Sequence, residues 1–124
     1  MKMFTLENDS QLNDIIDENK YTHYIIQLSA TWCRPCLQIT PSVKEHVSTI
    51  NNDSCVYIYA DVDKCPNLYQ YLKTNGIPGF IIMKRNETTG LYDVNKITTN
   101  QLYMIKQFFD DNDIYNSQQT PTFY

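Results

Sequence analysis

The sequence has no long apolar run and very little glycine. No segment approaches the roughly 20 consecutive apolar residues that a membrane-spanning helix needs. Nor is Lys2 followed by the run of about 7–15 apolar residues that marks a secretory signal. We therefore expect a cytoplasmic protein with no membrane contact. The 3 glycines stand against abundant Tyr, Asn and Ile, a bias typical of AT-rich genomes that excludes no function.

Clusters of basic side chains are also absent. The 10 Lys and Arg residues are scattered singly among 14 Asp and Glu, and the net charge is -4. Proteins that bind nucleic acids normally concentrate Lys and Arg, so we expect no nucleic-acid partner. The 124 residues suffice for one domain with its own core. We place this domain at residues 1–112 and expect a flexible tail at residues 113–124, where no periodic pattern continues.

Cysteine is present but sparse, since 4 cysteines are too few to staple a secreted mini-domain. Cys33 and Cys36 are separated by only two residues, which in a reducing compartment favours redox chemistry. Half of a zinc site is the alternative, but Cys55 and Cys65 are separated by nine residues and do not form a second closely spaced ligand pair. We expect no metal. Cys55 should be a small buried hydrophobe, whereas Cys65 could be an exposed, reactive thiol.

The close cysteine pair lies where a strand pattern changes into a helix pattern. Residues 24–28 are almost all apolar, as in a central strand covered on both faces. Farther on, Ile39, Val43 and Val47 recur at helical spacing. Two side chains at i and i+3 of a first helical turn lie on one face, close enough for a disulfide. Because backbone N–H groups at a helix start favour a thiolate, Cys33 is the candidate nucleophile.

Periodicity predicts further strands and helices in alternation. We expect strands at residues 2–6, 24–28, 55–60, 80–83 and 92–97, and helices at residues 9–18, about 35–50, 66–73 and about 100–109. Asn8, Asp9 or Ser10 should cap the first helix, and Thr99 or Asn100 the last. Such alternation predicts an α/β fold in which helices cover both faces of a mixed sheet.

Three motifs resemble the thioredoxin family. The first is Trp32-Cys33-Arg34-Pro35-Cys36, preceded by Ser29-Ala30-Thr31 and followed by Pro41. The second is Asp61-Val62-Asp63 with Cys65 beyond it, and the third is Ile77-Pro78 before an apolar strand. The resemblance runs from about Met3 to Phe109. It implies a thioredoxin-like fold, with a central mixed sheet of about five strands flanked by about four helices.

The resemblance also implies a reaction. Cys33 would attack a disulfide in a partner protein, and Cys36 would resolve the mixed disulfide, leaving the Cys33–Cys36 disulfide. A thioredoxin-reductase-type electron donor would then reduce that bond. No cofactor is implied beyond this redox-active disulfide, and we expect a monomer that acts on disulfide-containing proteins.

Several neighbours of the pair gain roles from the same resemblance. Trp32 and Pro35 would shape the site, and the Trp32 ring would offer a flat apolar contact to the partner. A cis bond before Pro78 would keep the loop against the cysteines. The backbone of Ile77, next to Pro78 and Gly79, would pair with the bound partner as a transient strand.

Four positions depart from the family pattern. Gln27 replaces a buried aspartate six residues before the first cysteine, and because an amide cannot accept the proton of the second thiol, resolution should be slower. Arg34 replaces the usual Gly, and its charge should favour the Cys33 thiolate and make the disulfide more oxidising. Gly79 replaces a Thr, and Asn95 aligns with a Gly near the site, so both should alter the partner-contacting surface.

Three functions therefore stand side by side at this point. We favour a protein thiol–disulfide oxidoreductase that acts through Cys33 and Cys36. A non-catalytic interaction module would keep the fold and its peptide-facing groove, and Gln27, Gly79 and Asn95 favour it. An oxidase or isomerase of folding proteins is the third function, which the missing secretory signal disfavours.

Overall fold

The computed structural model describes residues 1–115. Its strands are β1 (Lys2–Thr5), β2 (His23–Ser29), β3 (Cys55–Asp61), β4 (Gly79–Arg85) and β5 (Tyr92–Thr98). Its helices are α1 (Ser10–Asp17), α2 (Arg34–Ser48), α3 (Pro66–Leu72) and α4 (Leu102–Asp111). The predicted alternation of strands and helices is confirmed, and no end differs from its predicted position by more than two residues.

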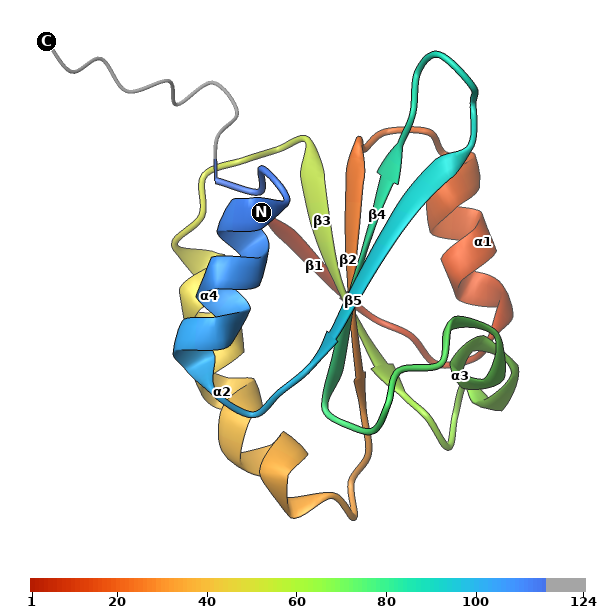
Figure 1. The fold of residues 1–124 in the computed structure, drawn as a ribbon. Coiled ribbons are helices and arrows are strands. Elements are labelled where there is room, and N and C mark those ends of the chain that lie inside the picture. Colours follow the sequence, from red (N-terminus) through yellow and green to blue (C-terminus); the bar gives the residue numbers. More distant parts are fainter. Residues whose placement is uncertain (116–124) are drawn as a thin grey trace, which may run out of the picture.

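The strands form one mixed sheet in the order β1-β3-β2-β4-β5 (Figure 1). β1, β3 and β2 run parallel, whereas β4 is antiparallel to β2 and β5 is antiparallel to β4. β2 is therefore hydrogen-bonded along both edges, and all 7 of its residues are buried. This double burial explains why residues 24–28 of β2 are apolar except for Gln27, instead of alternating.

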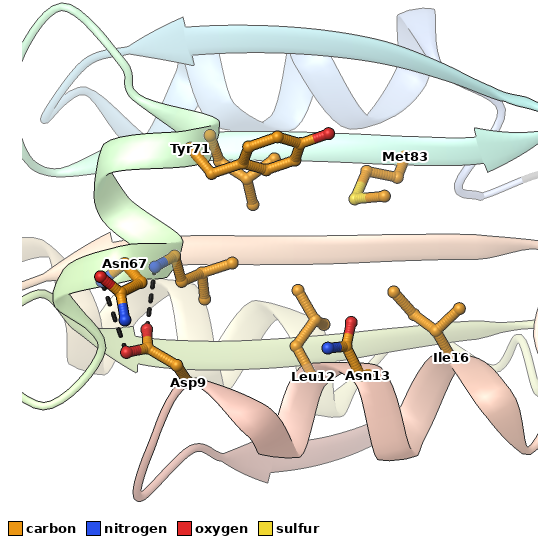
Figure 2. A pocket seen from close by; sticks show the side chains of 9 residues that line it. Asp9, Leu12, Asn13, Ile16, Asn67, Tyr71 and Met83 are labelled. Atoms are coloured by element: carbon orange, nitrogen blue, oxygen red, sulfur yellow. Dashed lines mark hydrogen bonds between the residues drawn. The ribbon is translucent and has the colours of Figure 1, made fainter.

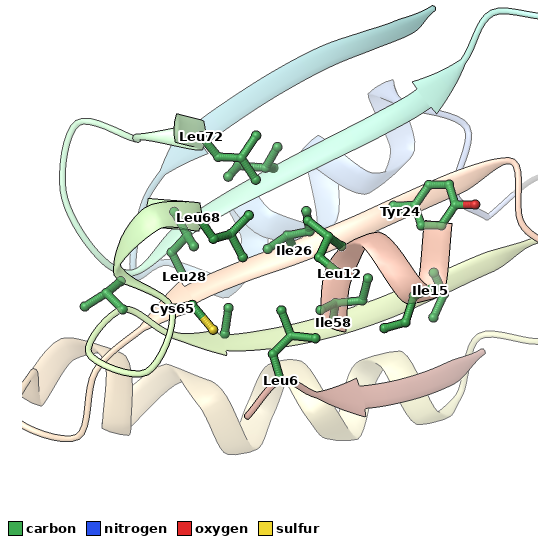
Figure 3. Packing of buried hydrophobic residues seen from close by; sticks show 14 of the residues in the cluster. Leu6, Leu12, Ile15, Tyr24, Ile26, Leu28, Ile58, Cys65, Leu68 and Leu72 are labelled. Carbon is green, nitrogen blue, oxygen red and sulfur yellow. The ribbon is translucent and has the colours of Figure 1, made fainter. Parts of the chain in front are cut away.

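Helices cover both faces of the sheet, as the sequence predicted. In Figure 1, α2 and α4 lie on one side of the sheet, and α1 and α3 lie on the other. Neighbouring residues of β2 divide between the two cores. Ile25 packs under α2 and α4, and Ile26 packs under α1 and α3, as Figure 3 shows. The first core includes Ile39, Val43, Val47, Ile105 and Phe109, and the second includes Leu12, Ile15, Leu68 and Leu72.

Two helix starts differ from the prediction. Asp9 is the N-cap of α1, but its side chain makes no hydrogen bond there. Its carboxylate instead accepts the backbone N–H of Leu68 at 2.8 Å and that of Asn67 at 3.4 Å, so it ties the first turn of α3 to α1 (Figure 2). The N-cap of α4 is Gln101 rather than either residue before it, so that prediction is wrong. The hydroxyl of Thr99 accepts the Gln101 N–H at 3.0 Å and forms a turn ahead of the helix.

A groove of about 450 Å³ lies between α1 and α3 (Figure 2). Tyr71 and Met83 lie on one side of it, and Leu12 and Ile16 lie on the other. No cysteine lines this groove, so it is separate from the cysteine pair. None of the helices within residues 1–115 has the length and apolar character needed to span a membrane.

The packed structure continues past the end of α4. Ile114 is fully buried, and the hydroxyl of Tyr115 lies 2.7 Å from Nε2 of His46 on α2. The expected domain boundary after residue 112 therefore falls inside a packed segment. The remainder of the predicted tail, residues 116–124, lies outside the described residues.

Two histidines link stability to pH. Burial lowers the pKa of His23 below its ordinary value of 6.5, and the charge of Lys84 lowers it further against the opposing effect of Asp113. Burial, followed by the charge of Lys106, also lowers the pKa of His46. Unfolding restores the ordinary pKa, so the unfolded chain binds protons more readily than the folded chain at mildly acidic pH.

We expect the free energy of unfolding of the oxidised protein to be highest above about pH 6.5 and to fall as the pH drops through the lowered pKa values. Urea titrations at about pH 7.5, 6.5 and 5.5 would measure this dependence. The double variant His23→Gln/His46→Gln should show a flatter dependence on pH. An equally steep dependence in wild type and double variant would assign the effect to other groups.

Candidate active site

The cysteine pair lies directly after the buried strand β2. The N–H of Cys33 donates to the carbonyl of Ala30 at 3.2 Å, which turns the chain toward α2. Cys33 is the N-cap of α2, with an extended backbone at φ -95° and ψ 106°, and Cys36 lies in the first turn. The two residues form a disulfide with their Cα atoms 5.3 Å apart. The predicted placement of the pair at a strand-to-helix junction is confirmed.

The two sulfur atoms have different surroundings. Cys33 retains 7% of its surface exposed, whereas Cys36 is fully buried. The backbone N–H of Cys36 donates to Sγ of Cys33 at 3.3 Å. The positive end of the α2 dipole lies at the same place. Once the disulfide is reduced, both effects stabilise a thiolate at Cys33, so Cys33 has the surroundings of a nucleophile and Cys36 those of a second, shielded thiol.

The loop between α3 and β4 faces Cys33. Its Ile77–Pro78 peptide bond is cis, as the resemblance implied. The carbonyl oxygen of Ile77 lies 3.8 Å from Sγ of Cys33, although 44 positions separate the two residues in the chain. Gly79, the first residue of β4, pairs with Leu28 near the end of β2. The antiparallel pairing of these strands therefore brings the loop to the cysteines.

Trp32 lies beside the pair and is 67% exposed. Its indole Nε1–H donates to the carboxylate of Asp63 at 2.8 Å, so the ring is held although it faces solvent. With Arg34, Leu37 and Gln38 it lines an open hollow of about 420 Å³. Trp32 is thus a surface residue of the site, and Arg34, the first residue of α2, is exposed next to it. Asp63 belongs to a motif that the sequence singled out, but its contact with Trp32 was not foreseen.

Gln27 is fully buried and belongs to a chain of neutral hydrogen bonds. The hydroxyl of Tyr57 donates to its Oε1, and its Nε2 donates to the hydroxyl of Thr40 at 2.9 Å. That hydroxyl donates in turn to the carbonyl of Cys36 at 2.6 Å. Burial, followed by the nearby phenol of Tyr59, raises the pKa of the Tyr57 phenol. None of these side chains can accept a proton near neutral pH, so the chain holds the first turn of α2 in place without acting as a base.

Asn95 does not lie at the site. It pairs with Ile82 in the middle of β5, and its side-chain amide donates to Oδ1 of Asn112 at 2.7 Å. The β5 residue opposite Gly79 is Thr98. The expectation that Asn95 alters the partner-contacting surface is therefore wrong, because the register of β5 places it away from the cysteines.

The other two cysteines are fully buried, with free thiols. Burial raises the pKa of Cys55 to about 12. Burial, followed by the charges of Asp9 and Asp61, raises the pKa of Cys65. Neither thiol has the exposure of a reactive cysteine. The expectation that Cys65 could be exposed and reactive is therefore wrong. Among residues 1–115, no three or more His, Cys, Asp or Glu side chains are grouped to hold a metal ion.

The sequence model of a family described as Thioredoxin matches residues 3–108. Thioredoxin-2 of Pyricularia oryzae is 29% identical over 87 residues, which cover 70% of this chain and 48% of the fungal protein. Thioredoxin of Oryctolagus cuniculus is 28% identical over 85 residues, which cover 68% of this chain and 79% of the rabbit protein. The match therefore spans about half the length of the first relative and about four fifths of the second.

Solved structures share the fold. A reduced thioredoxin pre-protein of Schistosoma mansoni superimposes with a TM-score of 0.74 at 21% identity, over 90% of this chain and 98% of that chain. A thioredoxin of Plasmodium falciparum gives a TM-score of 0.76 at 18% identity, over 90% of this chain and 88% of that chain. With the sheet order, the cysteine pair at the start of α2 and a family match over residues 3–108, the chain belongs to the thioredoxin family.

Proposed function

We propose that this protein is a thiol–disulfide oxidoreductase that reduces disulfide bonds in partner proteins. The observation that carries the proposal is the environment of the cysteine pair: Cys33 is partly accessible with a backbone N–H on its sulfur, and Cys36 is buried within disulfide distance. One sulfur is suited to attack and the other to resolution, which is what dithiol exchange requires.

The reaction starts from the reduced pair. The Cys33 thiolate attacks one sulfur of the partner disulfide; the Cys33–partner bond forms, the partner S–S bond breaks, and the second partner sulfur leaves as a thiolate. Cys36 loses its proton and attacks Sγ of Cys33, which forms the Cys33–Cys36 bond and releases the first partner sulfur. Two electrons pass to the partner, and its two sulfurs end as thiols. Because Gln27 cannot accept the Cys36 proton, that proton goes to solvent or to a departing thiolate.

Two surfaces beside Cys33 are suited to hold the partner. The backbone of Ile77 lies next to the sulfur, and a partner segment that pairs with it as an added strand would place a disulfide on Cys33. The exposed ring of Trp32 and the adjoining hollow offer an apolar contact for residues that flank the partner cysteine. We assign substrate contact to Ile77, Pro78 and Trp32 on these grounds.

Turnover requires an external electron donor for the Cys33–Cys36 disulfide. We assign this step to a thioredoxin-reductase-type protein, and we expect a monomer in which the face around Cys33 is open to donor and substrate in turn. The reduced pair of thiols carries both electrons, so the cycle needs no further cofactor. A reducing compartment such as the cytoplasm suits this direction of transfer.

Insulin reduction with dithiothreitol tests the function. We expect wild-type protein to accelerate precipitation of the insulin B chain, and Cys33→Ser to fall to the rate of dithiothreitol alone, because the attacking sulfur is lost. Cys65→Ala is the matched control and should keep wild-type activity, since its thiol is buried and unpaired. Equal turbidity with wild type and Cys33→Ser would favour an interaction module without catalysis.

Arg34 should make the pair less reducing. Its charge stabilises the Cys33 thiolate and therefore the reduced form, so Arg34→Gly should lower the reduction potential by about 10 mV, a roughly twofold change in the equilibrium constant. The effect should be small because Arg34 is exposed, and it should shrink in high salt. Equilibration with glutathione buffers would measure the potential, with Lys20→Gln as a control for charge. A potential that rises or stays constant in Arg34→Gly would refute this role.

Gln27 should slow the second step of the reaction. In Gln27→Asp, a buried carboxylate could accept the Cys36 proton, so resolution should be about tenfold faster or more above the pKa of the new carboxyl. Stopped-flow reaction of the reduced protein with 5,5′-dithiobis(2-nitrobenzoate) separates the steps: the first thionitrobenzoate reports attack by Cys33, and the second reports resolution by Cys36. Gln27→Asn, of the same shape but neutral, is the control. Identical second phases in the Asp and Asn variants at every pH would show that a base at residue 27 does not limit resolution.

A further inference from the structure

Thr74 and Gly79 close the loop that faces Cys33, although no sequence motif includes both of them. The loop runs from Thr74, just after α3, to Gly79, at the start of β4. Thr74 is 6% exposed, and its hydroxyl donates to the carbonyl of Gly76 at 2.6 Å. This bond folds the first half of the loop back on itself, immediately before Ile77 and Pro78.

The side chain of Thr74 also occupies the space beside Gly79. A Cβ atom placed on Gly79 would lie 2.8 Å from Cβ and from Cγ2 of Thr74, and nearer still to the hydroxyl oxygen, whereas real Cβ atoms essentially never come within 3.0 Å. Because the Cβ of Thr74 is among the close atoms, rotation of its side chain would not remove the clash. Thr74 and Gly79 are therefore fitted to each other across the base of the loop.

Strand β5 lies beside the loop. A Cβ atom on Gly76 would make ordinary contact, at 3.7 Å, with Cγ2 of Thr98 in β5. The ammonium group of Lys96, also in β5, donates to the carbonyl of Lys73 at 3.1 Å. The bond inside the loop is thus made by the Thr74 side chain, and Lys96 of β5 bonds the chain just before the loop.

We propose that Thr74 is a positioning residue for thiol–disulfide exchange: through Gly76 and Gly79 it fixes the Ile77 backbone at Cys33, where the partner strand docks. This role in exchange rests on the proposed function. Gly79 stands where the resemblance implied Thr because the threonine side chain that packs at this point comes from residue 74. Gly79 thus acts by leaving room for Thr74, and not by presenting a changed surface to the partner.

Three variants separate the parts of this proposal. Thr74→Val keeps the shape but removes the bond to Gly76; Thr74→Ser keeps the hydroxyl; and Thr88→Val, at an exposed threonine in the β4–β5 turn, is the control. We expect Thr74→Val to raise KM for insulin about three- to tenfold, with kcat within about twofold, because a lost hydrogen bond loosens the docking backbone. Thr74→Ser should recover most of the wild-type KM, and Thr88→Val should match wild type. The first phase of the reaction with 5,5′-dithiobis(2-nitrobenzoate), which needs no docked strand, should stay unchanged in all three variants.

Two further measurements, of hydrogen exchange and of stability, do not depend on catalytic activity. In the oxidised protein, Thr74→Val should increase amide hydrogen exchange at residues 75–77 and leave the β2 amides unchanged. Gly79→Ala should lower the free energy of unfolding, and Thr74→Gly/Gly79→Ala should lose less than the sum of its single changes, because the clash is gone.

Unchanged exchange at residues 75–77, additive stabilities, or an unchanged KM in an active Thr74→Val protein would each overturn the role of Thr74. Wild-type protein without Cys33-dependent activity would overturn the proposed function instead, and the exchange and unfolding data would still decide whether Thr74 holds the loop.

Discussion

The backbone N–H of Cys36 points at the sulfur of Cys33, and the site is arranged around that contact. It depends on β2, which is paired with β3 on one side and with β4 on the other and is buried throughout. A strand fixed in this way fixes the start of the helix that follows it. The apolar face of α2 then packs on the sheet through Ile39 and Val43, so the direction of its first N–H groups is set by burial.

Around this contact, the protein combines a reactive surface with a neutral interior. Arg34 and Trp32 lie on the outside of the pair, where they line an open hollow with Leu37 and Gln38. Beneath α2, Tyr57, Gln27 and Thr40 form a chain of hydrogen bonds. None of these side chains ionises near neutral pH. A buried carboxylate there would carry a desolvation cost but could take a proton. This protein thus has an uncharged, hydrogen-bonded support for α2 in place of a built-in base.

The sequence predicted most of the fold because the relevant signals are local. The apolar run of β2 and the spacing of Ile39, Val43 and Val47 each depend on a few neighbouring residues, and the cysteine pair marks their junction. Contacts between distant segments were not predictable in this way. Asp9 is the N-cap residue of α1, one of three residues expected there, but its carboxylate bonds the first turn of α3, 58 positions away. Asn95 was assigned to the site although the register of β5 places it elsewhere. Thr74 gave no signal at all, because its importance follows from the absence of a side chain at Gly79.

The central claim is that the helix start makes Cys33, and not Cys36, the reactive thiolate. Alkylation of the reduced protein with iodoacetamide over a range of pH, with each cysteine quantified by mass spectrometry, tests it most directly. We predict that Cys33 reacts with an apparent pKa clearly below the ordinary thiol value of about 8.5, while Cys36 stays unmodified over the same range. Equal labelling of the two cysteines, or a Cys33 pKa at or above the ordinary thiol value, would contradict the account.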